Sequence, residues 1–166
     1  MIIAITDACF LIDLIDINLF EEFLGLGYQI HITSSVFAEL EGDEYLKPVS
    51  KRIKQKKVFL YNLTADDQTA LEKLMRKLSS RLSEPDCSCL YLAKEINATI
   101  LTCEKLLTKA AKKLNLDVHG SLWILDQLLD SSMITKRTAY VKLKDLMLIN
   151  PRLPEKECEK RLKRWG

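Results

Sequence analysis

The run Ile2-Ile3-Ala4-Ile5-Thr6-Asp7 joins a short stretch of apolar or small residues to an acid that follows it directly. A stretch this short, rich in isoleucine and without alternation of polar and apolar residues, predicts a β-strand buried on both faces. Strands of that kind occur in parallel sheets that are covered by helices on both sides. We therefore expect an α/β fold in which Asp7 stands at the carboxyl end of a buried strand.

The same kind of segment returns along the chain, separated by helical patterns. Thr64 and Asp67 have the spacing of a helix-capping box, and Ser83, Pro85 and Asp86 suit the first turn of another helix. Strands that alternate with helices imply right-handed βαβ units and a three-layer α/β domain with a mainly parallel sheet of about five strands. The further strands are expected at residues 29–33, 58–61, 98–102 and 117–119.

Residues after about 120 have helical patterns only, at 122–129, 135–148 and 155–164. The Asn150-Pro151 pair should end the second of these helices, because the residue before a proline disfavours the helical conformation. We find no internal repeat and no flexible linker. The chain is therefore expected to form a single domain over residues 1–166, with a core at about 2–120 and a helical C-terminal extension over 121–166.

Composition narrows the class of protein. Apolar residues make up 48% of the chain and charged residues 29%, as in ordinary globular proteins, and the net charge is only +2. That balance argues against a protein that grips nucleic acid mainly by bulk positive charge. Two local basic runs, at 47–57 and 156–164, are either solvated helix faces or contacts to RNA phosphates.

Several absences indicate where the protein works. No segment approaches the roughly 18–20 apolar residues of a membrane helix, and the start of the chain lacks the basic lead of a signal peptide. Five cysteines, an odd number, suit reduced thiols better than a disulfide framework. We expect a soluble, cytoplasmic protein with no membrane partner.

Acids stand near the carboxyl ends of the predicted strands, where open α/β sheets form their sites. Asp7 directly follows one strand, Glu104 lies two residues beyond the strand that ends at Thr102, and Glu39 lies in the helix after residues 29–33. Asp86 opens the helix that leads into residues 98–102, and topology alone leaves open whether it reaches the others. Since 23 of 166 residues are acidic, any one of them could be structural, and their joint placement is what points to a site.

Carboxylates gathered in one cleft raise one another's pKa unless a cation compensates them. Such oxygen ligands suit Mg²⁺ or Mn²⁺, which can bind a phosphodiester oxygen and lower the pKa of a water molecule. The acids therefore predict a nuclease or a phosphatase. The two histidines, His31 and His119, have no partner nucleophile for a catalytic triad, and no glycine-rich phosphate loop is present. A response-regulator receiver is excluded, because Tyr61 and Asn62 stand where its phosphoacceptor aspartate would follow the third strand.

Four motifs, in order and spacing, resemble the PIN-domain ribonucleases, especially the VapC-like toxins of toxin–antitoxin pairs. They are Ile-Thr-Asp-Ala-Cys-Phe-Leu-Ile (5–12), Ile-Thr-Ser-Ser-Val-Phe-Ala-Glu-Leu (32–40), Leu-Ser-Glu-Pro-Asp (82–86) and Ile-Leu-Thr-Cys-Glu (100–104). The resemblance covers about residues 2–120, and the remainder looks like PIN-like proteins with extra C-terminal helices. It implies a metal-dependent ribonuclease that uses Mg²⁺ or Mn²⁺ to hydrolyse RNA, with a possible antitoxin partner and a homodimeric state.

The resemblance also implies roles for single residues. The four acids of the family fall on Asp7, Glu39, Asp86 and Glu104, with Asp7, Asp86 and Glu104 as metal ligands and all four in catalysis. Two positions depart from the family's pattern, because Glu104 stands where an aspartate is usual and Cys9 where a Ser, Thr or Asn is usual. These departures keep a second hypothesis open, a catalytically weakened PIN-like module that binds RNA or protein as a regulator.

Overall fold

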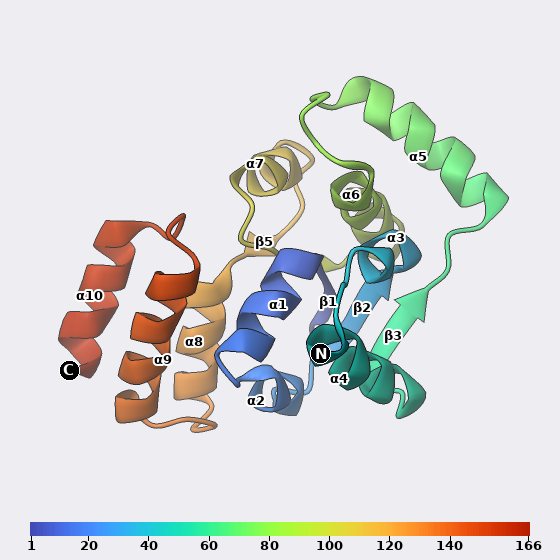
Figure 1. Cartoon of the computed structure of the whole chain (residues 1–166). Coiled ribbons are helices and arrows are strands. Elements are labelled where there is room, and N and C mark those ends of the chain that lie inside the picture. The colour runs from blue at the N-terminus through green and yellow to red at the C-terminus, as the bar shows by residue number, and fades with distance from the viewer.

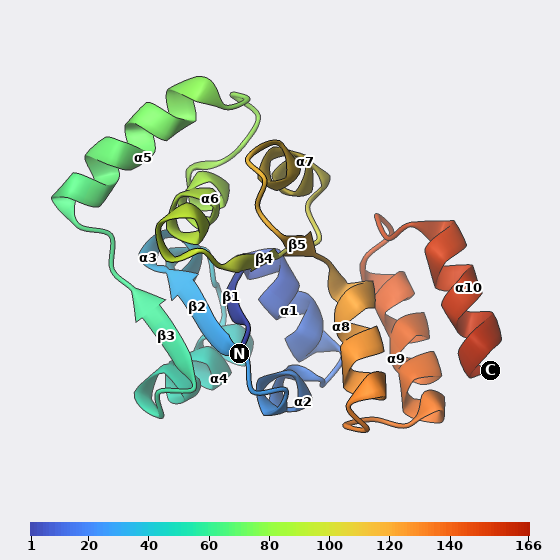
Figure 2. The same ribbon diagram turned by 180° about the vertical axis from the view of Figure 1, so that it is seen from behind.

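A computed structural model describes all 166 residues of the chain as one five-stranded sheet and ten helices. The strands pair in parallel throughout, in the spatial order β3-β2-β1-β4-β5 (Figures 1 and 2). This confirms the predicted α/β fold with a parallel central sheet. Their bounds are β1 (Ile3–Thr6), β2 (Gln29–Thr33), β3 (Val58–Tyr61), β4 (Thr99–Leu101) and β5 (Val118–His119).

Helices cover both faces of the sheet. From β1 the chain builds outward through β2 to β3, then returns to β4 on the other side of β1 and continues to β5. Right-handed crossovers therefore place the early helices on one face and the later ones on the opposite face; α1 and α4 stand in front of the strands in Figure 1 and behind them in Figure 2. The first group is α1 (Ala8–Asp16), α2 (Phe20–Gly25), α3 (Ser34–Ala38) and α4 (Asp43–Lys54), and the second is α6 (Glu84–Ile96) and α7 (Lys105–Lys113). Helix α5 (Ala65–Lys77) packs on α6, beyond the carboxyl end of β3 (Figures 1 and 2).

The predicted capping box at Thr64 and Asp67 forms, and the predicted helix start at residues 83–86 turns out to be a capping box as well. The Thr64 hydroxyl accepts from the Asp67 amide at the start of α5, and the Asp67 carboxylate accepts from the Thr64 amide. Ser83 and Asp86 make the same reciprocal pair at the start of α6, which runs to Ile96. These helix starts were readable from local sequence because the capping partners lie within one turn of each other.

Two helices were not predicted. The sequence patterns predict no helix over residues 8–28, and the structure folds most of them into α1 and α2. Phe10, Leu11 and Leu14 of α1 are almost wholly buried between the sheet and neighbouring helices. Asp13 of the same helix is also buried, so a charged residue falls among the apolar positions that a helical pattern would have to connect.

The C-terminal helices pack side by side beyond the β5 edge of the sheet, next to α1 and α2 (Figures 1 and 2). They are α8 (Ser121–Asp130), α9 (Lys136–Ile149) and α10 (Glu155–Trp165). Leu125, Leu143 and Trp165 from these helices belong to the same cluster of 39 buried apolar residues as the sheet. None of the helices has the length and apolar character that crossing a bilayer requires. The division into a core and an extension within one domain stays a prediction.

Candidate active site

The site lies where the order of the strands reverses. Strands β1 and β4 are neighbours, yet the chain leaves them in opposite directions, and open α/β sheets bind ligands at the carboxyl ends of such a pair. Asp7 follows β1 as the N-cap of α1 and is only 3% exposed. Its carboxylate accepts a hydrogen bond from the Phe10 amide at 2.9 Å and another from the Thr102 hydroxyl, which comes from the end of β4.

The acids that were singled out from the sequence lie in one electrostatic neighbourhood. Burial raises the pKa of Asp7 to about 7, and the charges of Asp86 and Glu104 add to that rise, against the hydrogen bonds from Thr102 and Phe10. Burial likewise raises the pKa of Glu39, with repulsion from Asp86 and Glu104 contributing. The pKa of Asp86 is also raised, by burial and by the charge of Glu104.

Contacts between α3 and α6 explain how Asp86 comes to this end of the sheet, a point that topology had left open. The Ser35 hydroxyl donates to Glu84 at 2.8 Å, and the hydroxyls of Thr33 and Ser88 lie 2.7 Å apart. These bonds hold the first turns of α6 against the end of β2 and the start of α3. Glu39 then ends α3 as its C-cap residue.

An arginine from the C-terminal region enters the same site. Nη1 of Arg152, in the turn between α9 and α10, lies 3.0 Å from both carboxylate oxygens of Glu104. Its Nη2 lies 3.6 Å from Sγ of Cys9. The two positions that depart from the family's pattern are therefore the two side chains that Arg152 contacts.

Buried hydrogen bonds fix the turn that carries Arg152. The Asn150 side-chain amide donates to the Asp13 carboxylate of α1 at 2.9 Å, and the Arg152 amide donates to Oδ1 of Asn150 at 3.1 Å. The Cys103 thiol also points to Asp13, at 3.5 Å. Burial raises the pKa of Asp13, opposed by the bonds from Asn150 and Cys103.

Sequence reasoning missed this arrangement. Asp13 is not among the candidate residues predicted from the sequence, although an acid at a buried position needs a hydrogen-bonding partner. The need for a hydrogen-bonding partner was the signal available in the sequence, and it did not identify Asn150 as that partner. Nothing in the local sequence around Arg152 pointed to the site, because its partners lie 48 and 143 residues away.

The oxygen donors of these acids are of the type that binds a divalent cation. A bound cation would reduce the repulsion between carboxylates that raise one another's pKa. No three acidic, histidine or cysteine side chains converge closely enough to hold a metal ion by themselves. Mg²⁺ commonly uses one or two carboxylates and keeps several waters, so the acids fit an ion of that kind without a closed protein cage. The assignment of Asp7, Asp86 and Glu104 as its ligands stays a prediction.

The two basic runs lie differently. Lys54 and Lys57 stand just before β3, at the amino ends of the strands, whereas the acids lie at the carboxyl ends. In the second run, Arg161 ion-pairs with Asp126 at 2.6 Å and Lys160 with Glu157 at 3.2 Å. His31 stacks on Phe59 with ring centroids 5.2 Å apart.

Comparison with known families agrees with the geometry. A family model described as a PIN domain matches residues 3–166, a range that includes α8, α9 and α10 as well as the sheet and its acids. None of the proteins of curated function matched the chain. Because the family match spans nearly the whole sequence, and because the fold and the placement of the acids agree with it, the chain belongs to the PIN-domain family, whose fold is of the nuclease type.

Proposed function

We propose that this protein is a metal-dependent ribonuclease that hydrolyses RNA phosphodiester bonds. One observation carries the proposal. Asp7 is buried at the strand-order reversal, and its pKa is raised by burial together with the charges of Asp86 and Glu104. Repulsion among several carboxylates lowers the stability of the folded protein. Clusters of this kind are typical of sites that bind a cation.

The residues divide the work by position. Asp7 and Asp86 would hold a Mg²⁺ or Mn²⁺ ion, directly or through water, and Glu104 would complete its shell. When bound, such an ion would lower the pKa of the attacking water and would neutralise negative charge on a phosphodiester oxygen. Thr102 orients the Asp7 carboxylate by its hydrogen bond. Glu39, with its raised pKa, is placed to orient the water and to take its proton.

Cleavage of a mixed RNA pool tests the proposal. The purified protein should cleave RNA with Mn²⁺ or Mg²⁺ and stop when EDTA is added. Asp7→Asn and Asp86→Asn should each lower the rate by at least about a hundredfold. The matched control is Asp130→Asn, because Asp130 is an exposed acid at the end of α8. Full activity in a well-folded Asp7→Asn variant would refute the assignment.

The biological setting of this activity is also a proposal, supported by the resemblance to VapC-like toxins. The chain would act in the cytoplasm as the toxin of a toxin–antitoxin pair, bind a cognate antitoxin protein and form a homodimer. Induced expression of the parent should arrest growth of a host cell, whereas Asp7→Asn should not. A chain that cleaves RNA without arresting growth would contradict the toxin role and leave the ribonuclease assignment standing.

A second candidate function is favoured by the contacts of Arg152. Its guanidinium donates hydrogen bonds to Glu104 and contacts the Cys9 sulfur. A cation of the protein itself therefore contacts both residues that depart from the family's pattern. Because Arg152 already neutralises the charge of Glu104, the site suits a catalytically weakened module that binds RNA or protein as a regulator. RNA binding without cleavage at any Mn²⁺ concentration would select this alternative.

A further inference from the structure

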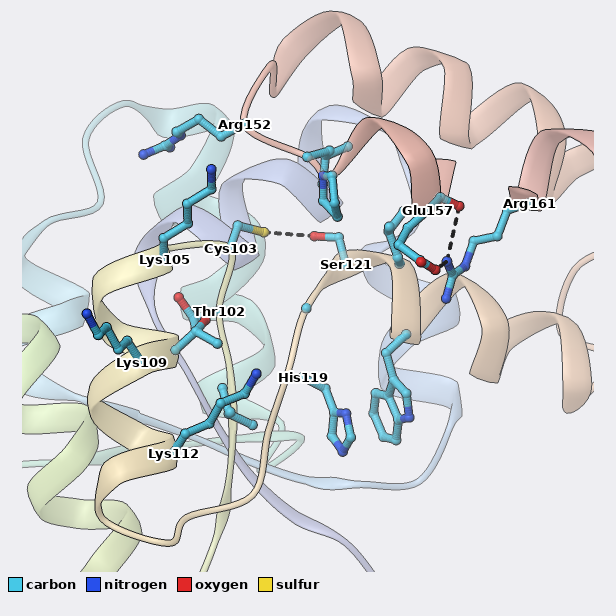
Figure 3. A pocket seen from close by; sticks show the side chains of 17 residues that line it. Thr102, Cys103, Lys105, Lys109, Lys112, His119, Ser121, Arg152, Glu157 and Arg161 are labelled. Atoms are coloured by element: carbon cyan, nitrogen blue, oxygen red, sulfur yellow. Dashed lines mark hydrogen bonds and ion pairs between the residues drawn. The ribbon is translucent and has the colours of Figure 1, made fainter. Parts of the chain in front are cut away.

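A groove of about 800 Å³ begins beside the acids and runs between α7 and the C-terminal helices (Figure 3). Thr102 and Arg152 line its inner end, and these residues contact Asp7 and Glu104. From there the groove continues past α7 on one side and past the start of α8 and the start of α10 on the other. It therefore extends the candidate active site along the surface.

One wall of this groove carries a row of free positive charges. Lys105, Lys109 and Lys112 lie on one face of α7, all exposed, and none of them forms an ion pair (Figure 3). The single acid that lines the groove, Glu157, is engaged by Lys160 and Arg161. From Lys105 to Lys112 the helix rises about 10 Å, the length of about three nucleotide steps of a stacked strand.

The other wall carries a stack of aromatic rings. The His119 ring lies on the Trp123 ring with a centroid distance of 4.0 Å and an angle of 10°. Tyr28 also stacks against Trp123, at 6.1 Å. The His119 side chain remains 29% exposed and lines the groove across from Lys112 (Figure 3). The flat His119 ring at the end of the stack can stack against a nucleobase, and the row of lysines opposite it can bind phosphates.

We propose that this groove binds a single strand of nucleic acid, with phosphates on the lysine row of α7 and a base on His119. The inference rests on the proposed function in that the groove would carry the part of the strand adjoining the bond that is cleaved. Cations without protein partners bind phosphates by releasing counterions, and stacking accepts any base. The groove thus positions a strand without reading a defined sequence through hydrogen bonds.

Binding measured without cleavage tests this inference separately from hydrolysis. Fluorescence anisotropy in EDTA would use a labelled ten-nucleotide uridine RNA, its single-stranded DNA counterpart and an RNA duplex. Lys109→Gln/Lys112→Gln should weaken binding of the RNA at least tenfold. It should also reduce the slope of log affinity against log salt by about 1.4, because each lost phosphate contact of a single strand contributes about 0.7.

Matched variants separate the groove from general charge. Lys54→Gln/Lys57→Gln removes the same charge at the opposite edge of the sheet and should leave affinity and salt slope unchanged. His119→Ala should weaken binding about tenfold, and His119→Phe, which keeps a ring, should restore it. Thermal melts would confirm that each variant is folded.

The outcomes distinguish the two proposals. Single-strand binding that depends on these residues supports the groove even if no variant or metal yields cleavage, and the ratio of RNA to DNA affinity then identifies the preferred strand. Cleavage by a protein whose affinity is indifferent to Lys109, Lys112 and His119 would overturn the groove and leave the ribonuclease standing. Tighter binding of the duplex, or equal losses in the Lys54→Gln/Lys57→Gln control, would also overturn it.

Discussion

Arg152 and Glu104 meet across 48 residues of sequence, with one guanidinium nitrogen 3.0 Å from both carboxylate oxygens. The ion pair joins the C-terminal helices to the acidic site, since Glu104 follows β4 and Arg152 lies between α9 and α10. An aspartate at position 104 would be shorter by one methylene group. The glutamate, which departs from the family's usual residue, is the side chain that Arg152 holds.

Removing this arginine should make the site a better metal site. Arg152→Gln is expected to lower the Mn²⁺ concentration for half-maximal binding several-fold, because it removes a cation that competes for Glu104. Isothermal titration calorimetry at low salt measures this directly. The control is Arg164→Gln, since Arg164 is an exposed cation of α10 that contacts Asp126 and no acid of the site. Weaker Mn²⁺ binding by Arg152→Gln would show that the arginine supports the site instead of competing for it.

Asp7→Asn should stabilise the metal-free protein while it abolishes activity. The Asp7 carboxylate is buried beside other acids, so its neutral analogue should raise the free energy of unfolding by about 1–3 kcal/mol at pH 8 in EDTA. Urea denaturation followed by circular dichroism measures the change. Millimolar Mg²⁺ should then stabilise the parent but not the variant, because binding to the native state alone shifts unfolding. A destabilised Asp7→Asn variant would indicate that the carboxylate is structural.

The Asn150 side chain should matter for stability as well as for the site. Asn150→Ala is expected to lower the free energy of unfolding by about 1–3 kcal/mol, because it removes a buried hydrogen bond to the Asp13 carboxylate. It should also move Mn²⁺ affinity in the same direction as Arg152→Gln, since Asn150 holds the turn of Arg152. Thr99→Ala removes an exposed hydrogen bond to Asp117 and should cost less than about 0.5 kcal/mol. Equal losses in the two variants would contradict this reading of the turn.

The capping carboxylate of α5 should shape stability in acid. Hydrogen bonds from the Tyr91 hydroxyl, the Thr64 amide and the Tyr61 hydroxyl lower the pKa of Asp67 to about 2, from an ordinary value of 3.8. A lowered pKa gives stability that is present above pH 4 and is lost as the pH falls from about 4 to about 2.

The parent should therefore lose more stability over this window than Asp67→Asn does, as measured by urea denaturation at a series of pH values. Asp66→Asn is the matched control, because Asp66 is an exposed neighbour in the same helical turn. Its pH dependence should follow the parent. A parent and Asp67→Asn with parallel profiles below pH 4 would rule out this role.

Much of the fold was accessible from local patterns. The five strands lie at the predicted ranges and the predicted capping box of α5 forms, because strand formation and helix capping depend on residues close in sequence. The parallel order follows from right-handed crossovers between such strands. Helix α1 was not predicted, because the acid Asp13 is buried among its apolar residues and interrupts the pattern by which a helix is recognised.

The candidate site was likewise predictable from local sequence only in part. Local sequence determined that Asp7 and Glu104 follow strands, and parallel pairing of β1 with β4 then brings their positions to one edge. Only the tertiary structure decided that Asp86 joins them, that Asn150 satisfies Asp13, and that Arg152 reaches Glu104. Those relationships depend on how whole helices pack against the sheet, and packing brings together residues whose partners are absent from their own sequence neighbourhoods.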